Sequence, residues 1–260
     1  AKFRAARRLY ARLMRERFQA DDASARLRFH TQTGGVTLQA QQPLNNVVRV
    51  AVQALAAVLG GTQSLHTNGY DEALALPTEA SATLALRTQQ ILAFESGMTR
   101  SVDPLAGSWY VEALTDRIEA QARALIEDVD AMGGAAAAVE RGYFQRAIAD
   151  SAWAMQQAQE AGDVTVVGVN RFADQAPPPS LVVPDYHALE QEQRARLAEV
   201  KRRRDSTAVA STLAAIGSAA AGTTPLLPPI IEAVRVRATL GEISDTLRAV
   251  WGTYHADGTR

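Results

Sequence analysis

Two clusters of polar residues, each within or directly after a short run of β-forming residues, are the candidates for chemistry in this sequence. They are His30, Gln32, Gly34 and Gly35 in the first cluster, and Gln63, Ser64, His66, Asn68, Asp71 and Glu72 in the second. Ligands of parallel α/β proteins bind at the carboxyl ends of the strands. The clusters therefore predict a site for a polar small molecule, with loop polarity and helix capping as the competing interpretation.

Other uses of these residues fit the spacing poorly. A zinc site needs three or four ligands, often at short helical spacing, and no His-x-x-x-His or Glu-x-x-His occurs. Ser64 lacks the Gly-x-Ser-x-Gly turn of a serine nucleophile. The Gly-Gly pairs match no phosphate-binding loop. The sequence has no cysteine, which excludes disulfides, thiolate metal ligands and cysteine nucleophiles.

The elements that must position the clusters alternate between helix and strand up to residue 111. Amphipathic periodicity predicts helices over residues 2–18, 44–58 and 79–96, and runs of β-formers predict strands over residues 27–33, 62–67 and 99–102. This alternation is typical of parallel strands joined by helices. Three strands are too few to close a barrel, so we expect them to belong to a larger sheet.

The remainder of the chain is predicted to be almost entirely helical. Helices are expected over residues 112–131, 135–141, 143–161, 186–204, 206–218, 228–238 and 241–251. One apolar run, Val164 to Val169, is typical of a strand. The proline-rich segment Ala173 to Pro184 is typical of a linker, and we place a boundary near Asp174.

Composition indicates an ordinary globular protein, with 47% hydrophobic residues and a net charge of −1. That charge gives no general attraction to nucleic acid or to an anionic membrane. Basic residues gather in residues 1–28 and 201–204, either on solvated helix faces or against an anionic ligand or partner. No signal peptide or membrane-length apolar run is visible, so a cytoplasmic location is expected. The chain starts within a helical pattern and without methionine, and we expect it to be part of a longer sequence.

The sequence around both clusters resembles the methylmalonyl-CoA mutase family. The matching stretches are Arg28-Phe-His-Thr-Gln-Thr-Gly-Gly35, Ala40-Gln-Gln-Pro-Leu-Asn-Asn-Val-Val-Arg49, Gly61-Thr-Gln-Ser-Leu-His-Thr-Asn68, Asp71-Glu-Ala-Leu-Ala-Leu-Pro-Thr78, Asp103-Pro-Leu-Ala-Gly-Ser-Trp-Tyr-Val-Glu112 and Val167-Gly-Val-Asn170. Their order and spacing agree over roughly residues 1–175. Residues 176–260 match only in general character.

The resemblance implies an α/β fold, the C-terminal portion of a (β/α)8 TIM barrel followed by a helical C-terminal region. Residues 1–111 would supply the last strands and helices of the barrel, 112–175 a helical extension packed on it, and 176–260 a linker and C-terminal helices. It also implies an acyl-CoA substrate threading the barrel and adenosylcobalamin (coenzyme B12) over its mouth. The implied activity is an isomerase reaction, the radical rearrangement of (R)-methylmalonyl-CoA and succinyl-CoA.

The resemblance also assigns roles to residues by motif. His30, Gln32, Gln63 and Ser64 would face the barrel interior and bind the acyl-CoA. Gly35, Asn68, Glu72 and Ala75 would face the cofactor, with Glu72 accepting hydrogen bonds from the adenosyl ribose. No catalytic residue in the strict sense is expected in this portion, because those residues of the family lie in the first half of the barrel. No metal ligand is expected either, because the spacing of His30 and His66 fits no metal site.

The resemblance implies two protein partners, the N-terminal half of the barrel and a separate cobalamin-binding small subunit or domain. Asp185-Tyr-His187 matches the start of the cobalt-ligating Asp-x-His-x-x-Gly motif, but position 190 is glutamate, so we interpret it as a helix start. The alternative activity is that of isobutyryl-CoA mutase or another acyl-CoA mutase large subunit. An alternative of another class is a non-catalytic, helix-rich binding module.

Overall fold

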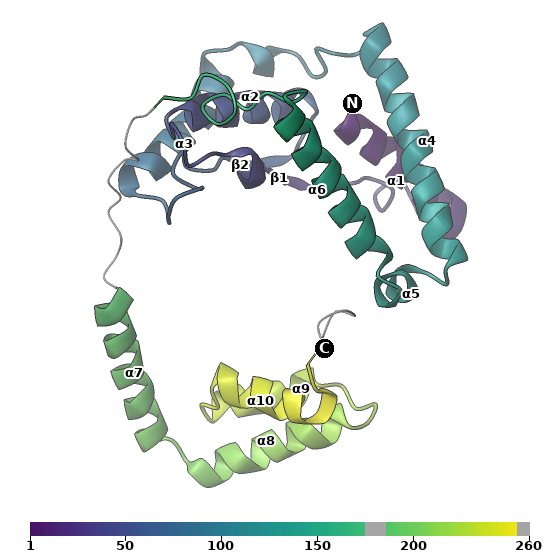
Figure 1. Ribbon diagram of the computed structural model, residues 1–260. Helices are drawn as coiled ribbons and strands as arrows, with labels where there is room; N and C mark the ends of the chain where they lie inside the picture. The colour runs from purple at the N-terminus through teal and green to yellow at the C-terminus, as the bar shows by residue number, and fades with distance from the viewer. Residues whose placement is uncertain (175–185, 254–260) are drawn as a thin grey trace. The chain divides into compact units, whose positions relative to one another are not determined.

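The protein, seen here in a computed structural model, is described over residues 1–174 and 186–253. It divides into two compact units, Ala1–Val183 and Pro184–Arg260, which are treated separately (Figure 1). The division falls about ten residues after the predicted boundary, and the predicted linker lies largely outside the described residues. No helix within the described ranges is long and apolar enough to cross a membrane.

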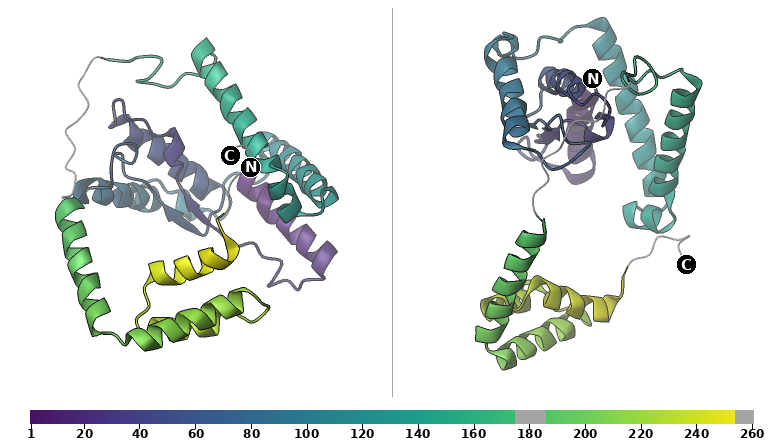
Figure 2. Two further views of the ribbon diagram at one scale, coloured as in Figure 1. Left: turned by 60° about the horizontal axis from the view of Figure 1, so that its bottom comes forward. Right: turned by 60° about the vertical axis from the view of Figure 1, so that its left-hand side comes forward.

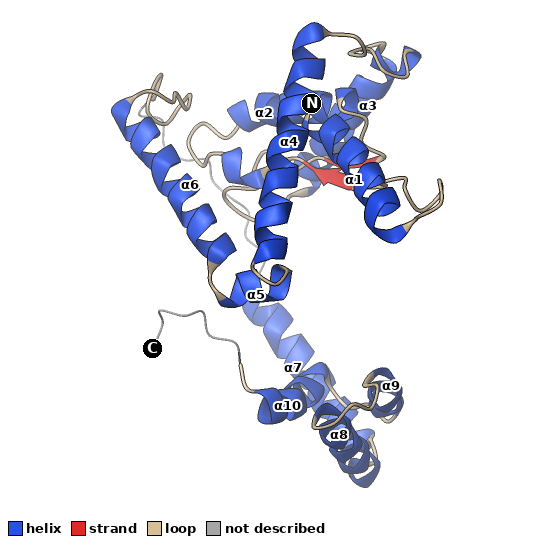
Figure 3. Cartoon of the chain, turned by 90° about the vertical axis from the view of Figure 1, so that its right-hand side faces the viewer, coloured by secondary structure: helices blue, strands red, loops and turns tan. Residues whose placement is uncertain are grey.

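The first unit is a helical α/β fold built around two short parallel strands, β1 (His30–Gln32) and β2 (Ser64–His66), drawn in red in Figure 3. Helix α2 (Asn45–Leu59) connects them. One stripe of α2 is buried at helical spacing, formed by Asn46, Val50, Ala54 and Ala57. The prediction of an α/β fold is confirmed at this level, with a sheet of two strands.

Helix α1 (Lys2–Phe18) packs against α4 (Trp109–Ala131) through a ladder of ion pairs. The pairs are Arg4 with Asp103 and Glu112, Arg8 with Asp116 and Glu119, Arg12 with Glu119, Arg17 with Asp130, and Arg123 with Glu16. Arg4 lowers the pKa of Asp103 by a side-chain hydrogen bond. Carboxylates from α4 and its approach therefore pair with most of the arginines of the first helix, which keep partial access to water.

The third predicted strand is wrong. Helix α3 (Glu79–Phe94) is followed by a left-handed Gly97 and the 3-10 helix η2 (Met98–Arg100). Thr99 Oγ1 donates to Ala93 O at 3.1 Å, and Met98 N donates to Ser96 Oγ at 3.2 Å. Arg100 N donates to Gly97 O at 3.1 Å, so this main-chain donor is used within the turn, and the Thr99 hydroxyl bonds the end of α3.

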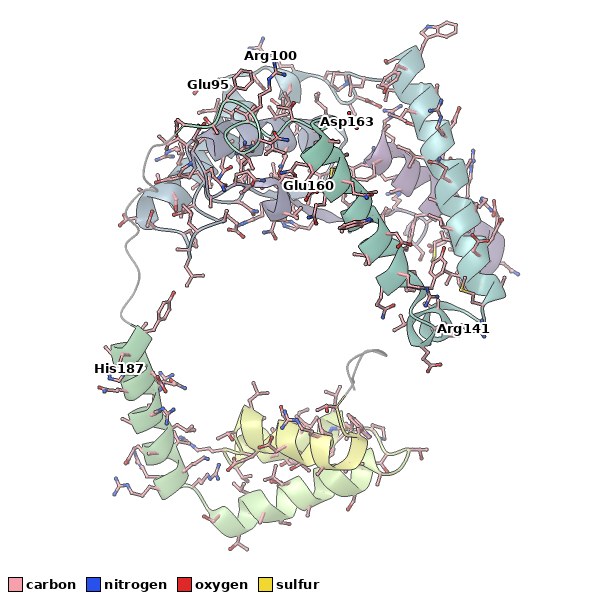
Figure 4. The ribbon with its side chains drawn as sticks, in the orientation of Figure 1. Glu95, Arg100, Arg141, Glu160, Asp163 and His187 are labelled. Carbon is pink, nitrogen blue, oxygen red and sulfur yellow. The ribbon has the colours of Figure 1, made fainter. Side chains whose placement is uncertain are left out.

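Helices α4, α5 (Ala135–Glu140) and α6 (Tyr143–Ala161) follow in sequence, with α4 and α6 diverging from α5 (Figure 1). Asp163 marks the end of α6, where the chain turns back toward α2 (Figure 4). The apolar run from Val164 is a loop with one isolated bridge, Val167 to Arg171, so the strand-like interpretation is wrong. Asn170 explains this, because its side chain bonds the main chain of Val166, Gln159 and Val164 in place of a neighbouring strand.

The second unit consists of four helices, α7 (Tyr186–Arg203), α8 (Ser206–Ala220), α9 (Leu227–Arg235) and α10 (Leu240–Trp251), in its described part. Helices α9 and α10 pack on α8 around Ile216, Ala233 and Ile243 (Figure 2). Arg204, after α7, forms two hydrogen bonds with the Glu242 carboxylate, which also closes a capping box with Thr239. Arg204, the last residue of the basic run at 201–204, thus stabilises the contact between the end of α7 and α10.

This half-buried contact predicts acid sensitivity in the second unit. The Arg204 guanidinium, with help from Thr239, holds the pKa of Glu242 far below its ordinary value. A depressed pKa stabilises the fold above the unfolded value, near pH 4.5, and the contribution is lost as pH falls through the folded value. We expect the urea concentration at the unfolding midpoint of α8 and α10 to decrease once the pH is below about 4.5. Hydrogen exchange in these two helices measures the midpoint.

The matched variant is Glu242→Gln, which should lower the stability of this unit by about 1.5 kcal/mol at pH 7. It should also flatten the pH dependence between pH 5 and pH 3. An unchanged midpoint at pH 7, or an undiminished acid transition in the variant, would contradict this account.

Candidate functional site

The candidate site begins with one exposed face of the β1–β2 pair. The strands pair in register His30 to Ser64 and Gln32 to His66. In each strand the first and third residues are exposed and the middle one is half-buried. Side chains alternate across a strand, so the four exposed polar residues share one face.

Neutral hydrogen bonds organise this face. His30 Nδ1 lies 2.6 Å from Ser64 Oγ, and Gln32 Nε2 donates to Asn68 Oδ1 at 2.9 Å. An imidazole, amides and a hydroxyl can bind uncharged carbonyl and amide groups without the desolvation cost of an ion pair. Of the predicted substrate-binding residues, the structure brings His30, Gln32 and Ser64 together.

Gln63, the fourth predicted substrate-binding residue, has a different position. It lies one residue before β2, where alternation assigns it to the opposite face from Ser64. Its Oε1 accepts a hydrogen bond from Phe29 N at 3.0 Å, which joins the starts of the two strands. His66 occupies the polar face instead, and strict alternation from Ser64 was the signal that could have identified it.

Three predicted cofactor-binding residues meet beside this face. A Cβ atom on Gly35 would lie 3.2 Å from Asn68 Nδ2 and 3.6 Å from Glu72 Cγ. Gly35 does not adopt a positive φ, so close approach rather than backbone freedom favours glycine here. Asn68 is 2% exposed and is fixed by two hydrogen bonds to Thr33. The main-chain N of Asn68 donates to Thr33 Oγ1 at 3.0 Å, and its side-chain Nδ2 donates to Thr33 O at 3.1 Å.

Glu72 brings an exposed carboxylate to the Gly35 position. Over the described ranges this carboxylate has no hydrogen bond or ion pair, which leaves it available to hydroxyl donors. Ala75, the fourth predicted cofactor-binding residue, lies half-buried in the same turn, where its N donates to Asp71 O at 3.1 Å. No described contact joins Ala75 to Gly35.

Asp71, although part of the polar cluster, has a structural position. It is 3% exposed, and its Oδ2 accepts from Thr78 N at 3.3 Å just before α3. Its main-chain oxygen accepts from Leu74 N and Ala75 N. The main-chain oxygen therefore shapes the turn that carries Glu72, and the carboxylate joins that turn to the start of α3 through Oδ2, while its Oδ1 is buried without a hydrogen-bond partner among the described residues.

A largely apolar groove of about 840 Å³ adjoins the Gly35 loop through Val36. The 3-10 helix η1 (Gly35–Thr37), α2, the end of α6 and the loop at residues 164–167 form its walls. Arg49 in this groove donates to Val167 O at 2.7 Å, which fastens that loop to α2.

His187, from the partial cobalt-ligating motif, belongs to the second unit. His187 lies in the first turn of α7, where its Nε2 lies 2.8 Å from Gln191 Nε2, and Asp185 is outside the described residues. No group of three or more metal-ligating side chains occurs within the described ranges.

Comparison with known proteins decides the family. The methylmalonyl-CoA mutase family model matches residues 1–253. The chain belongs to the methylmalonyl-CoA mutase family. It is 47% identical over 259 residues to methylmalonyl-CoA mutase of Rhizobium meliloti, covering 98% of the chain and 36% of that protein.

Two further relatives are similar over nearly the whole chain. The chain is 46% identical over 257 residues to the 2-hydroxyisobutanoyl-CoA mutase large subunit of Aquincola tertiaricarbonis, covering 98% of the chain and 46% of that protein. It is 40% identical over 260 residues to human mitochondrial methylmalonyl-CoA mutase, covering 99% of the chain and 35% of that protein. The chain thus spans less than half the length of these relatives.

Proposed function

We propose that the chain forms part of an adenosylcobalamin-dependent acyl-CoA mutase that interconverts (R)-methylmalonyl-CoA and succinyl-CoA. The observation that carries this proposal is a neutral polar strand face beside the Gly35 position and the Glu72 carboxylate, in a member of this family. A thioester carbonyl needs hydrogen-bond donors and ribose hydroxyls need acceptors, and this set of side chains supplies both.

The strand face is proposed to bind the acyl-CoA. His30, Gln32 and Ser64 would orient the thioester and pantetheine by hydrogen bonds, with Gln63 contributing from the start of β2. These strands would belong to a (β/α)8 barrel completed by residues outside this chain. A polar inner face supports that arrangement, because a barrel without a ligand is normally filled by bulky apolar side chains.

The Gly35 position fits a large planar cofactor. A missing side chain lets the backbone come close to a ligand, and Asn68 and Glu72 border the space that a Cβ would fill. Glu72 would accept hydrogen bonds from ribose hydroxyls, and Ala75 would border the same loop. When bound, adenosylcobalamin would supply the radical chemistry, while this chain would orient the reacting groups and exclude water.

A second protein region is proposed to hold the other face of the cofactor. The relative from Aquincola tertiaricarbonis is named a large subunit, which favours a separate small subunit or domain carrying the cobalamin. The described residues include no group of three or more metal-ligating side chains, and the partial cobalt-ligating motif at His187 lacks its glycine, because position 190 is glutamate.

The assay that tests this function uses the complete protein with its cobalamin-binding partner. We expect methylmalonyl-CoA to be converted into succinyl-CoA only when adenosylcobalamin is added. Because relatives of two different names are almost equally similar, 2-hydroxyisobutanoyl-CoA is the second candidate substrate, and isobutyryl-CoA completes the panel. Failure to turn over any of the three would reject the proposed function.

Replacing Glu72 tests the cofactor role directly. Glu72→Ala is expected to weaken adenosylcobalamin binding by about 1–3 kcal/mol, the usual cost of losing a hydrogen bond to a charged group. Thermal stability should change little, since Glu72 is exposed and unpaired. Titration of the complete enzyme with the cofactor measures the change.

The matched control is Glu79→Ala, an exposed glutamate in the first turn of α3. It should leave cofactor affinity unchanged and cost only about 0.3–1 kcal/mol of helix stability. Equal affinities for the two variants would argue against Glu72 as a cofactor contact.

A further inference from the structure

Asn46 is a completely buried amide in the first turn of α2, 0% exposed, behind the candidate site. Its Nδ2 donates to Gln39 O and to Tyr70 O, both at 2.8 Å. Its Oδ1 accepts from Gln39 N at 3.0 Å and from Arg49 Nη1 at 2.7 Å. The amide thus uses both donors and two acceptor positions, which is the full capacity of an asparagine side chain.

These bonds join two loops that are far apart in sequence. Gln39 follows η1 in the loop after β1, which carries Gly35, and Tyr70 belongs to the loop after β2, which carries Glu72. The amide pairs with both main-chain groups of Gln39, as a neighbouring strand would. It therefore fixes the two loops to the same helix at one point.

Arg49 extends the same connection to a third segment. One of its nitrogens, Nη1, bonds Asn46 Oδ1, and the other, Nη2, bonds Val167 O in the loop after α6. Two side chains one helical turn apart on α2 thereby link three loops, of which those carrying Gln39 and Val167 line the groove beside Gly35.

We propose that Asn46 is a positioning residue that sets the separation of the Gly35 and Glu72 loops, and so prepares the site for its cofactor before binding. This inference rests on the proposed function, because it concerns the same adenosylcobalamin site. Only a neutral amide suits the position. A carboxylate would place an oxygen against the Gln39 and Tyr70 carbonyl oxygens and lose both donated bonds.

Asn46→Asp in the complete enzyme is the test, and Asn45→Asp is its control. Asn45 is the adjacent asparagine, and its Nδ2 donates only to Gln42 Oε1, at 2.8 Å, within the same turn. In the cofactor-free protein, Asn46→Asp is expected to speed hydrogen exchange about tenfold in residues 34–39 and 69–75, but not in α1 or α8. The Kd for adenosylcobalamin should rise about 10–100-fold, the scale expected when contact groups are misplaced by about 1 Å.

The acyl-CoA KM separates positioning from general damage. It should change less than threefold in Asn46→Asp, because the strand face that binds the thioester does not depend on this amide. A parallel rise in KM, or faster exchange throughout the protein, would mean a merely structural role and would overturn the inference. Asn45→Asp should match the wild type in every readout.

Arg49→Met keeps the inference testable if Asn46→Asp does not fold. This variant removes one bond to Asn46 and the bond to Val167, while the three bonds between the amide and the two loops remain. A rise in cofactor Kd of about threefold, with faster exchange in the same two segments, is expected. No change in either quantity would reject the inference. Wild-type enzyme that fails to bind adenosylcobalamin would instead reject the proposed function, so the two failures are distinguishable.

Discussion

Replacing Gly35 with leucine is expected to raise the Kd for adenosylcobalamin more than 100-fold, a loss of about 2.7 kcal/mol or more. The physical reason is space, because even a Cβ on Gly35 would lie 3.2 Å from the fixed amide of Asn68. A longer side chain would enter the volume proposed for the cofactor. Spectroscopic titration of the complete enzyme measures the effect.

A graded series makes this result specific. Gly35→Ala should raise Kd about tenfold, since one methyl group can be accommodated in part by a shift of Asn68. Gly34→Ala is the control, because its Cβ would approach nothing nearer than Gln53 Oε1, at 3.8 Å. The melting temperature of the cofactor-free enzyme should stay within a few degrees for all three variants. Retained affinity in Gly35→Leu would remove Gly35 from the cofactor site.

Replacing Glu119 with alanine is expected to destabilise the first unit by about 3 kcal/mol. The Glu119 side chain is 5% exposed and lies between Arg8 and Arg12, so its loss leaves two guanidinium groups without their shared partner. The estimate is at the lower end for a buried pair because both arginines keep partial access to water. Thermal unfolding should shift by roughly 6–12 °C.

Asp116→Ala supplies the comparison on the same helix. Asp116 also pairs with Arg8, but its side chain is 69% exposed. Water and salt screen that interaction, so we expect a loss of less than about 0.5 kcal/mol. Equal melting temperatures for the two variants would show that burial of Glu119 does not strengthen the α1–α4 contact.

Helices were predictable from sequence because their signals are local. The apolar stripe of α2 and the glycine that follows α3, Gly97, each lie within a single stretch of sequence. The observed helix ends differ from the predicted ones by only a few residues. The third strand failed because its β-branched residues were read for propensity alone. In the structure, the Thr99 and Ser96 hydroxyls donate to main-chain oxygens at the end of α3, an alternative that composition does not reveal.

The sequence predicted which strand ends carry the candidate site, but not how their side chains are arranged relative to one another. Spacing placed His30 and Ser64 on strands, yet the register that pairs them depends on tertiary contacts. Because side chains alternate along a strand, the sequence alone would have placed His66 on the same face as Ser64. Asn46 could not be recognised from sequence, because its partners at Gln39 and Tyr70 converge only after the strands pair.

The α1–α4 ladder also has a consequence for synthesis on the ribosome. Arg8 and Glu119 are 111 residues apart, so the first helix emerges long before its partner. At about 5–20 residues per second, an interval of roughly 5–20 s separates the two. During that time the arginine-rich face of α1 is uncovered in the presence of ribosomal RNA, a polyanion that competes for the same charges. Release of the nascent chain from that competitor would then coincide with the appearance of α4, which makes docking of α1 a late step in folding.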